Sequence, residues 1–256
     1  MIEIKTPAEI ESMRRASRVV AEVLAELEPL VKPGVSTSEL DSFAERRVRE
    51  LGAVPAFLGY RGYPATLCVS INEEIVHGIP SPKRIIKEGD IVSLDMGAIC
   101  EGFYGDAALT AAAGKIQGPA QRLMDVTKRS LELALSEVKA GARLGDVSHA
   151  VQKYAEAQGM AVVKEFTGHG IGRHLHEDPS IPNYGKAGTG PVLRAGMTLA
   201  IEPMLCLGRA EIVVKEDGWT AVSADGSLAA HYEHTVAVTE DGCDILSAVS
   251  KGVKKF

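Results

Sequence analysis

The sequence contains no long apolar run, since no stretch of 18 consecutive apolar residues occurs among its 256 residues. A membrane-spanning helix needs about 20 such residues, so a transmembrane protein is not expected. Residues 1–7 also lack the apolar stretch of a secretory signal peptide. We therefore expect a soluble, cytoplasmic protein with no membrane partner.

Cysteine is scarce, and none of the cysteines forms a Cys-x-x-Cys pair. The chain has four of them: Cys68, Cys100, Cys206 and Cys243. This number and spacing do not make a disulfide framework in a chain of this length. Reduced thiols fit a cytoplasmic protein.

An excess of basic residues is also missing. The chain has 28 Lys and Arg against 34 Asp and Glu, which gives a net charge of −6. Nucleic-acid-binding proteins usually carry a basic excess or a basic stripe. The local basic cluster, Lys251, Lys254 and Lys255, is interpreted as a solvated end of the chain. No nucleic-acid partner is expected.

A weak internal repeat is present. Residues 31–35 (Val-Lys-Pro-Gly-Val) reappear at 138–142 as Val-Lys-Ala-Gly-Ala, and residues 87–95 resemble 194–202. Both pairs have the same offset, because 138 − 31 and 194 − 87 are both 107. Two helix-strand patterns of similar length could also agree by coincidence. The repeat favours two similar halves.

The composition fits one globular unit made of these halves. Hydrophobic residues make up 45% and charged residues 24%, as in an ordinary globular enzyme with a sizeable core. Helical periodicity after Thr6 and after Ser36 predicts two helices in the first half, and residues 119–138 and 146–159 predict two in the second. We expect a single domain over 1–256, with ααβ halves of about 1–115 and 116–256.

The repeat singles out two acids, Asp95 and Glu202, at equivalent positions of the halves. Each follows a run of residues that is typical of a buried strand. Burying a carboxylate without a partner is costly. The two acids therefore indicate a shared central site.

Asp95 and Asp106 lie on either side of a hairpin turn that is expected at 99–102. If the turn is centred between Cys100 and Glu101, paired residues have numbers that sum to 201. Asp95 would then lie directly opposite Asp106, with Cβ atoms about 4.5–5.5 Å apart. Such a pair is compatible with a carboxylate dyad that shares a proton, a glycosidase acid/base pair or a metal site.

Other residues favour the metal site. Glu233 is a further acid within a strand pattern, and His169 lies in a glycine-rich turn. With Asp95, Asp106 and Glu202 they would place about four negative charges in one pocket, which two divalent cations would balance. Oxygen ligands with one imidazole favour Mn, Fe(II), Co or Zn. Taken singly, each of these residues also has an ordinary structural explanation.

The chain resembles the type I methionine aminopeptidases of the pita-bread (creatinase/aminopeptidase) superfamily of metallopeptidases, family M24, over about residues 4–246. The resemblance is carried by these motifs in order: residues 59–64 (Gly-Tyr-Arg-Gly-Tyr-Pro), 68–73 (Cys-Val-Ser-Ile-Asn-Glu), 77–80 (His-Gly-Ile-Pro), 102–106 (Gly-Phe-Tyr-Gly-Asp), 168–173 (Gly-His-Gly-Ile-Gly-Arg), 176–179 (His-Glu-Asp-Pro), 201–204 (Ile-Glu-Pro-Met), 217–220 (Asp-Gly-Trp-Thr) and 232–235 (Tyr-Glu-His-Thr). Only 26 residues separate His176 from Glu202 (202 − 176), which leaves no room for the long insertion of type II relatives.

The resemblance implies an α+β fold, with two pseudo-symmetric ααβ halves around a curved antiparallel sheet. It also implies two divalent metal ions, with Asp106 and Glu233 as bridging ligands. The full ligand set that it implies is Asp95, Asp106, His169, Glu202 and Glu233.

The implied activity is removal of the initiator methionine from nascent polypeptides, at the ribosome, when the second residue is small. A monomer is expected. Glu202 is predicted to move the proton of the attacking water, because a carboxylate beside it can accept and return a proton. His176 is predicted to stabilise the oxyanion, and His77 to contact the scissile amide.

The resemblance further implies a methionine pocket, because an unbranched thioether suits apolar, polarisable walls. Its lining would be Phe57, Tyr60, Tyr63, Cys68, Leu175 and Trp219. Leu175 stands where an aromatic residue is common in the family, and Phe57 where a smaller residue is common. These two departures can compensate in volume.

Three further histidines receive no catalytic role. The resemblance assigns nothing to His174, which we expect to be exposed or to lie behind the ligands. His231 and His234 flank Glu233, and we expect both to point to the opposite face of the strand, in structural roles.

Two alternatives remain. An Xaa-Pro peptidase of the same superfamily would normally carry an additional N-terminal domain, which a first helix near Thr6 does not accommodate. A binding protein that has lost catalysis would not need five side chains competent to bind metal.

Overall fold

The structure is a computed structural model that describes residues 1–248, so the basic cluster at Lys251, Lys254 and Lys255 lies outside the described residues. The α-helices are α1 (Pro7–Leu27), α2 (Thr37–Glu50), α3 (Gly118–Ser136) and α4 (Leu144–Ala157), with short 3-10 helices at Glu28–Leu30 and Tyr60–Gly62. The strands are β1 (Val54–Pro55), β2 (Leu67–Ile71), β3 (Glu74–Val76), β4 (Ile91–Cys100), β5 (Phe103–Ala112), β6 (Ala161–Val162), β7 (Thr167–Gly170), β8 (Glu177–Pro182), β9 (Thr198–Ile201), β10 (Met204–Cys206), β11 (Ile212–Val214), β12 (Ala221–Ser223), β13 (Ala229–His231), β14 (Glu233–Val238) and β15 (Cys243–Ile245).

The first two helices begin at capping boxes. Thr6 Oγ1 accepts a hydrogen bond from Glu9 N at 3.3 Å, and Glu9 Oε2 accepts one from Thr6 N at 2.8 Å. Ser36 and Glu39 repeat this arrangement at the start of α2. Each box satisfies backbone N–H groups that have no partner within the helix. The sequence therefore fixes where both helices start.

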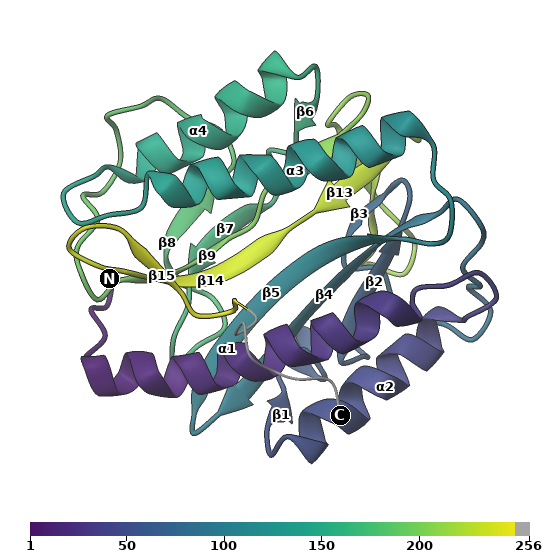
Figure 1. Cartoon of the computed structure of the whole chain (residues 1–256), viewed down its shortest axis with the longest axis horizontal. Coiled ribbons are helices and arrows are strands. Elements are labelled where there is room, and N and C mark those ends of the chain that lie inside the picture. The colour runs from purple at the N-terminus through teal and green to yellow at the C-terminus, as the bar shows by residue number, and fades with distance from the viewer. Residues whose placement is uncertain (249–256) are drawn as a thin grey trace.

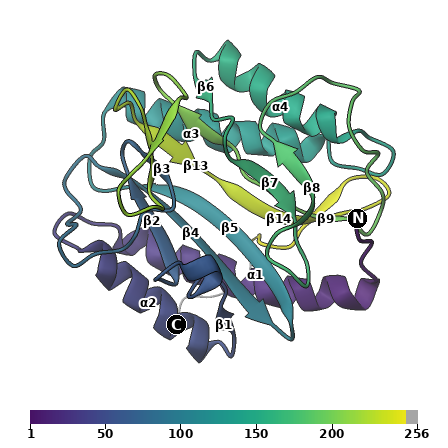
Figure 2. The same ribbon diagram turned by 180° about the vertical axis from the view of Figure 1, so that it is seen from behind.

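The main sheet is antiparallel throughout, with the order β1-β4-β5-β14-β9-β7-β8; in addition, β2 pairs with β4 and β15 with β14. Two smaller sheets have the orders β13-β10-β6 and β11-β12-β3. The long helices lie along one face of the curved main sheet, with α1 and α2 on one half and α3 and α4 on the other (Figure 1). Seen from behind, the opposite face is free of these helices (Figure 2).

The two halves are pseudo-symmetric about the line between β5 and β14. The isolated bridges Ser36↔Ile85 and Arg143↔Val192 are equivalent, since 143 − 36 and 192 − 85 are both 107. The starts of α2 and α4 (144 − 37) and of β4 and β9 (198 − 91) differ by the same 107 residues. The α+β fold with two ααβ halves around a curved antiparallel sheet is therefore confirmed.

The predicted register of the β4–β5 hairpin is wrong by two residues. Asp106 pairs with Gly97, and Asp95 pairs with Ala108. The turn is the two-residue loop Glu101-Gly102, whose φ angles of 51° and 77° are both positive. A tight hairpin turn of type I′ needs positive φ at both central residues, and Gly102 adopts it without strain. Asp95 and Asp106 are thus diagonal neighbours on one face of the hairpin, not direct partners.

Candidate metal centre

The five predicted metal ligands come from five segments of the main sheet. Asp95 lies on β4, Asp106 on β5, His169 on β7, Glu202 directly after β9 and Glu233 at the start of β14. Their side chains line one cavity of about 160 Å³. The strands that carry them run side by side, so residues more than 130 positions apart in the sequence meet at one place (233 − 95 is 138).

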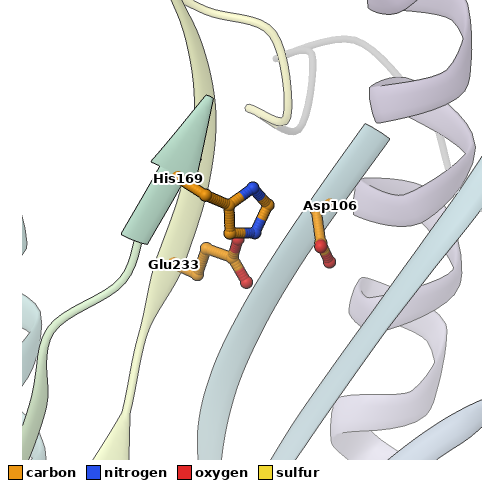
Figure 3. A group of neighbouring side chains, drawn as sticks. All are labelled: Asp106, His169 and Glu233. Carbon is orange, nitrogen blue, oxygen red and sulfur yellow. The ribbon is translucent and has the colours of Figure 1, made fainter. Parts of the chain in front are cut away.

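Three of these side chains form the tightest group. Asp106, His169 and Glu233 are buried, and each offers a ligand atom within 4.8 Å of the other two. Figure 3 shows them pointing toward one another from β5, β7 and β14. This is the spacing expected of donors that can share a cation.

Three carboxylates of the site each have an oxygen without a hydrogen-bond partner. Asp95 Oδ1, Asp106 Oδ1 and Glu233 Oε1 are buried and find no hydrogen-bond partner within residues 1–248. Burial raises the pKa of Asp95 to about 7. Burial, reinforced by the charges of Glu233 and Asp95, raises the pKa of Asp106 well above its usual value. These shifts favour the protonated acids in the absence of cations, and bound cations favour the ionised form.

His169 adds a separate argument for a cation. Its Nδ1 lies 2.8 Å from the carbonyl oxygen of Gly170, which only accepts, so Nδ1 must donate. In the neutral ring, Nε2 then carries a lone pair. Burial, with a smaller effect of the His176 charge, lowers the pKa of His169 to about 4 and keeps the ring neutral. Nε2 nevertheless lies 3.6 Å from Glu202 Oε1, another acceptor. A divalent cation is the natural partner of both atoms, so the residues fit a metal.

His176 lies at the mouth of the cavity and is tied to Tyr60. The Tyr60 hydroxyl is 2.9 Å from His176 Nδ1, and the two rings stack with centroids 5.5 Å apart. Burial, followed by the charge of Arg61, lowers the pKa of His176. When Tyr60 donates to Nδ1, the neutral ring carries its proton on Nε2 and can act as a donor.

His77 lines the same cavity. Its ring packs edge-on against Phe166 and Trp219, at 5.3 and 6.2 Å between centroids. Burial, more than the nearby His176, lowers the pKa of His77 to about 4. Its φ of 62° lies in the left-handed region, which directs the side chain differently from a regular strand.

The apolar part of the cavity is formed by the predicted pocket residues. Tyr63 contacts Trp219 edge-on at 5.1 Å, and its hydroxyl donates to the carbonyl oxygens of Leu67 and Gly78. Phe57 packs with Leu175 in one cluster and with Cys68 in another. The residues of this part are Phe57, Tyr60, Tyr63, Cys68, Leu175 and Trp219.

A family model decides what kind of centre this is. The model of metallopeptidase family M24 matches residues 11–240. This chain belongs to metallopeptidase family M24.

Two methionine aminopeptidases of this family match over nearly their whole length. The chain is 50% identical to the methionine aminopeptidase of Clostridium acetobutylicum over 247 residues, 96% of this chain and 99% of the relative. It is 49% identical to methionine aminopeptidase 1 of Bacillus subtilis, over 97% and 100% of the two chains.

Solved structures agree. The methionine aminopeptidase of Thermotoga maritima superposes with a TM-score of 0.95 at 51% identity, over 96% of this chain and 99% of that one. The prolidase of Pyrococcus furiosus shares the fold, with a TM-score of 0.76 at 22% identity, and this chain covers 66% of it. The pita-bread fold that the sequence predicts is confirmed.

Sequence reasoning missed two residues of this M24 site. Arg61 lines the same cavity, and its guanidinium lies 5.4 Å from the centre of the Tyr60 ring. The signal was available, because Arg61 lies inside the motif at 59–64. His231 was predicted to point away from the site; instead its Nε2 lies 3.8 Å from Glu202 Oε2. His231 ends β13 and Glu233 begins β14, so the chain brings both residues to the centre.

His234 and His174 agree with the roles that the sequence predicts for them. His234 faces away from the centre, and its Nδ1 lies 2.8 Å from Ser247 Oγ. His174 is exposed and is not among the residues that line the cavity.

Within residues 1–248, no helix is both long and apolar enough to cross a membrane.

Proposed function

We propose that this protein is a metal-dependent aminopeptidase that removes the initiator methionine from nascent polypeptides when the second residue is small. The observation that carries the proposal is the convergence of four acids, of which Asp106 and Glu233 are buried, and of His169 beside a pocket with apolar walls. Relatives that are about 50% identical over nearly the full chain are named methionine aminopeptidases, which supports the same activity here.

Two divalent cations would be held by Asp95, Asp106, His169, Glu202 and Glu233, with Asp106 and Glu233 shared between them. The buried unpartnered carboxylate oxygens and the lone pair on His169 support this ligand set. Mn, Fe(II), Co and Zn suit such oxygen-rich donors. When bound, the ions supply Lewis-acid activation of water and of the scissile carbonyl.

Side chains of the protein then transfer the protons and stabilise the negative charge that develops on the substrate. Glu202 accepts the proton of the attacking water and returns it to the leaving amine. His176 donates toward the oxygen that becomes negative, oriented by its contact with Tyr60. His77 meets the scissile amide from the side of Phe166 and Trp219.

The pocket would hold the methionine side chain. Its aromatic and sulfur-containing walls match a flexible, polarisable thioether. Tyr63 is anchored by hydrogen bonds to two backbone carbonyls, so the wall is preorganised. Leu175 and Phe57 pack in one cluster, which supports the idea that they compensate in volume.

We also propose that residues 1–256 form one catalytic domain in which neither half is complete. The first half provides Asp95 and Asp106, and the second provides His169, Glu202 and Glu233. A cytoplasmic monomer that acts on chains emerging from the ribosome fits this activity. The cysteines, which all lie within the described residues, are unpaired and accord with a reducing compartment.

One assay tests the activity. Metal-free protein is supplied with Mn²⁺, Co²⁺ or Fe(II), and release of Met from Met-Ala-Ser is followed beside cleavage of an Xaa-Pro peptide. We expect metal-dependent Met release. Absence of release with every ion would refute the proposal, and preferred cleavage of the Xaa-Pro peptide would assign the chain to the prolidase-like branch of the fold.

A further inference from the structure

His231 is a buried side chain that the chemistry described above does not use. It is 1% exposed and ends β13, opposite Met204 of β10. Neither of its ring nitrogens has a hydrogen-bond partner among the described residues. Buried polar groups in folded proteins almost always have a partner, so an imidazole with both nitrogens unpaired requires an explanation.

The backbone of His231 is held without help from the ring. His231 N donates to Thr110 Oγ1 at 3.0 Å, and Thr110 Oγ1 donates to His231 O at 2.9 Å. Ser93 Oγ lies 2.9 Å from Thr110 Oγ1 and completes this buried network. The backbone of His231 is therefore held in place by Thr110, and the imidazole ring is free to interact elsewhere.

An oxygen of Glu202 lies close to the ring. The two oxygens of Glu202 face different imidazoles: Oε1 lies 3.6 Å from His169 Nε2, and Oε2 lies 3.8 Å from His231 Nε2. His169 cannot donate, because its proton is on Nδ1. His231 can present an N–H at Nε2 in either protonation state. An approach of about 0.6 Å would bring the pair to the usual range of an N–H···O bond.

We propose that His231 is a positioning residue of the metal centre, whose Nε2–H donates to Glu202 Oε2 and thereby turns Oε1 toward His169 and the other ligands. This inference rests on the proposed function. Carboxylates that bind metals are commonly oriented by a hydrogen bond to the oxygen that faces away from the ion. Here the donor lies at the end of β13, two positions before Glu233, so one short segment orients one ligand and provides another.

The test compares Mn²⁺ binding to the metal-free wild type and to two variants by isothermal titration calorimetry. His231→Gln retains an N–H donor of similar reach, whereas His231→Met fills the space without a donor. We expect His231→Met to weaken Mn²⁺ binding by about 10–100-fold, the range for loss of a partner of a metal ligand. His231→Gln should restore most of the affinity. For Met-Ala-Ser, kcat should fall in His231→Met with little change in KM.

His234→Gln is the matched control. It changes a half-buried histidine on the same chain segment that faces Ser247 instead of Glu202. Its Mn²⁺ affinity should equal that of the wild type. Calorimetry needs no substrate, so a wild type that binds Mn²⁺ but releases no Met would end the proposed function and leave this comparison intact.

Two results would overturn the positioning role. Wild-type Mn²⁺ affinity in His231→Met would show that the ring does not orient Glu202. Loss of one bound ion in both His231 variants would show that His231 is itself a ligand.

If His231→Met does not fold, NMR spectroscopy of the wild-type protein tests the same hydrogen bond. In ¹⁵N-histidine NMR spectra of the Zn²⁺-loaded protein, we expect the His231 Nε2–H to be hydrogen-bonded and slow to exchange. A His231 ring with its only proton on Nδ1 would refute the proposal.

Discussion

At the scale of single residues, the acids of the metal centre destabilise the folded state when no cations are bound. Asp106 and Glu233 are 4% and 3% exposed, and each leaves an oxygen unpaired within residues 1–248. Burial and neighbouring charges raise their pKa values in the metal-free protein. Such groups are retained for binding and not for stability, because an uncompensated buried charge is strongly unfavourable.

Asp106→Asn tests whether this acid supports metal binding at the expense of stability. The amide is a poor shared ligand, so bound Mn²⁺ per protein should fall and Met release should drop by at least about 100-fold, more than loss of a partner to a ligand costs. The melting temperature of the metal-free protein should stay the same or rise, because one repelling buried acid is gone. Metal analysis, the peptide assay and thermal melts check these outcomes.

Asp125→Asn is the control for this prediction, since Asp125 is exposed on α3 and interacts with Gln121. It should leave all three measurements unchanged. Full metal content in Asp106→Asn would contradict the ligand assignment.

A second prediction at the residue scale concerns the effect of Arg61 on His176. Its charge lowers the pKa of His176 in addition to the larger effect of burial. Arg61→Gln should therefore raise the pKa of His176, because a nearby positive charge that disfavours the protonated ring is removed. A histidine NMR titration of the metal-free protein measures this directly. Arg209→Gln, a change at a distant exposed arginine, should have no effect. An unchanged His176 pKa in Arg61→Gln would show that the two groups are not coupled.

At the scale of elements, the position of Asp106 depends on how closely α1 packs on β5. Gly105 faces the helix, and a Cβ atom there would lie 2.4 Å from the backbone nitrogen of Ser17. A contact this short requires the helix or the strand to move. The neighbouring residue Asp106 would move with the strand.

Gly105→Ala should accordingly destabilise the protein by about 1–3 kcal/mol, the usual cost of overpacking. For a chain of this size, that lowers the melting temperature by roughly 2–4 °C per kcal/mol. Mn²⁺ affinity should fall as well, because Asp106 is displaced. Gly118→Ala, at the open first residue of α3, meets no atom within 4 Å and should be neutral or slightly stabilising. Equal melting temperatures for the two variants would refute the close-packing argument.

The sequence predicted some element boundaries and missed others for identifiable reasons. Thr6 and Ser36 cap their helices as expected, because each has a glutamate three residues later. The fourth helix was expected from Asp146 but begins at Leu144. Asp146 is the third residue of that helix, and its carboxylate accepts a hydrogen bond from Arg143 N at 2.9 Å. It therefore caps the helix start from a position within the first turn and does not precede the helix. An acid near a helix start fits either position.

At the scale of the whole molecule, the shared site makes stability depend on pH and on metal together. The folded-state pKa of Asp95 is about 7, above the usual value near 4 of an unfolded chain. A raised carboxyl pKa means that the folded state binds the proton more tightly. Its contribution to stability is present below about pH 4 and is lost as the pH rises toward 7. The other acids of the site shift in the same direction.

Metal should reverse this trend. Cations bind the ionised ligands, so they compete with protons, and their affinity rises with pH. We expect Mn²⁺ to raise the melting temperature more at pH 8 than at pH 5.5; at 100-fold excess over Kd the gain is about 2.7 kcal/mol. Thermal melts with Mn²⁺ or chelator at the two pH values measure it. In Asp106→Asn the difference between the pH values should shrink. An Mn²⁺ effect that is the same at both values would contradict the linkage.

The sequence by itself determined the α+β class, the 107-residue repeat, the helix starts at the capping boxes and the residue types of the site. These features depend on local periodicity and on short motifs, which neighbouring residues specify. The tertiary structure decided the hairpin register, the proximity of Arg61 to His176 and the side on which His231 lies. A two-residue turn at Glu101-Gly102, set by backbone angles, moved Asp95 out of direct pairing with Asp106. The contact of His231 with Glu202 depends on β13 meeting β10 across the fold, and no local pattern carries that information.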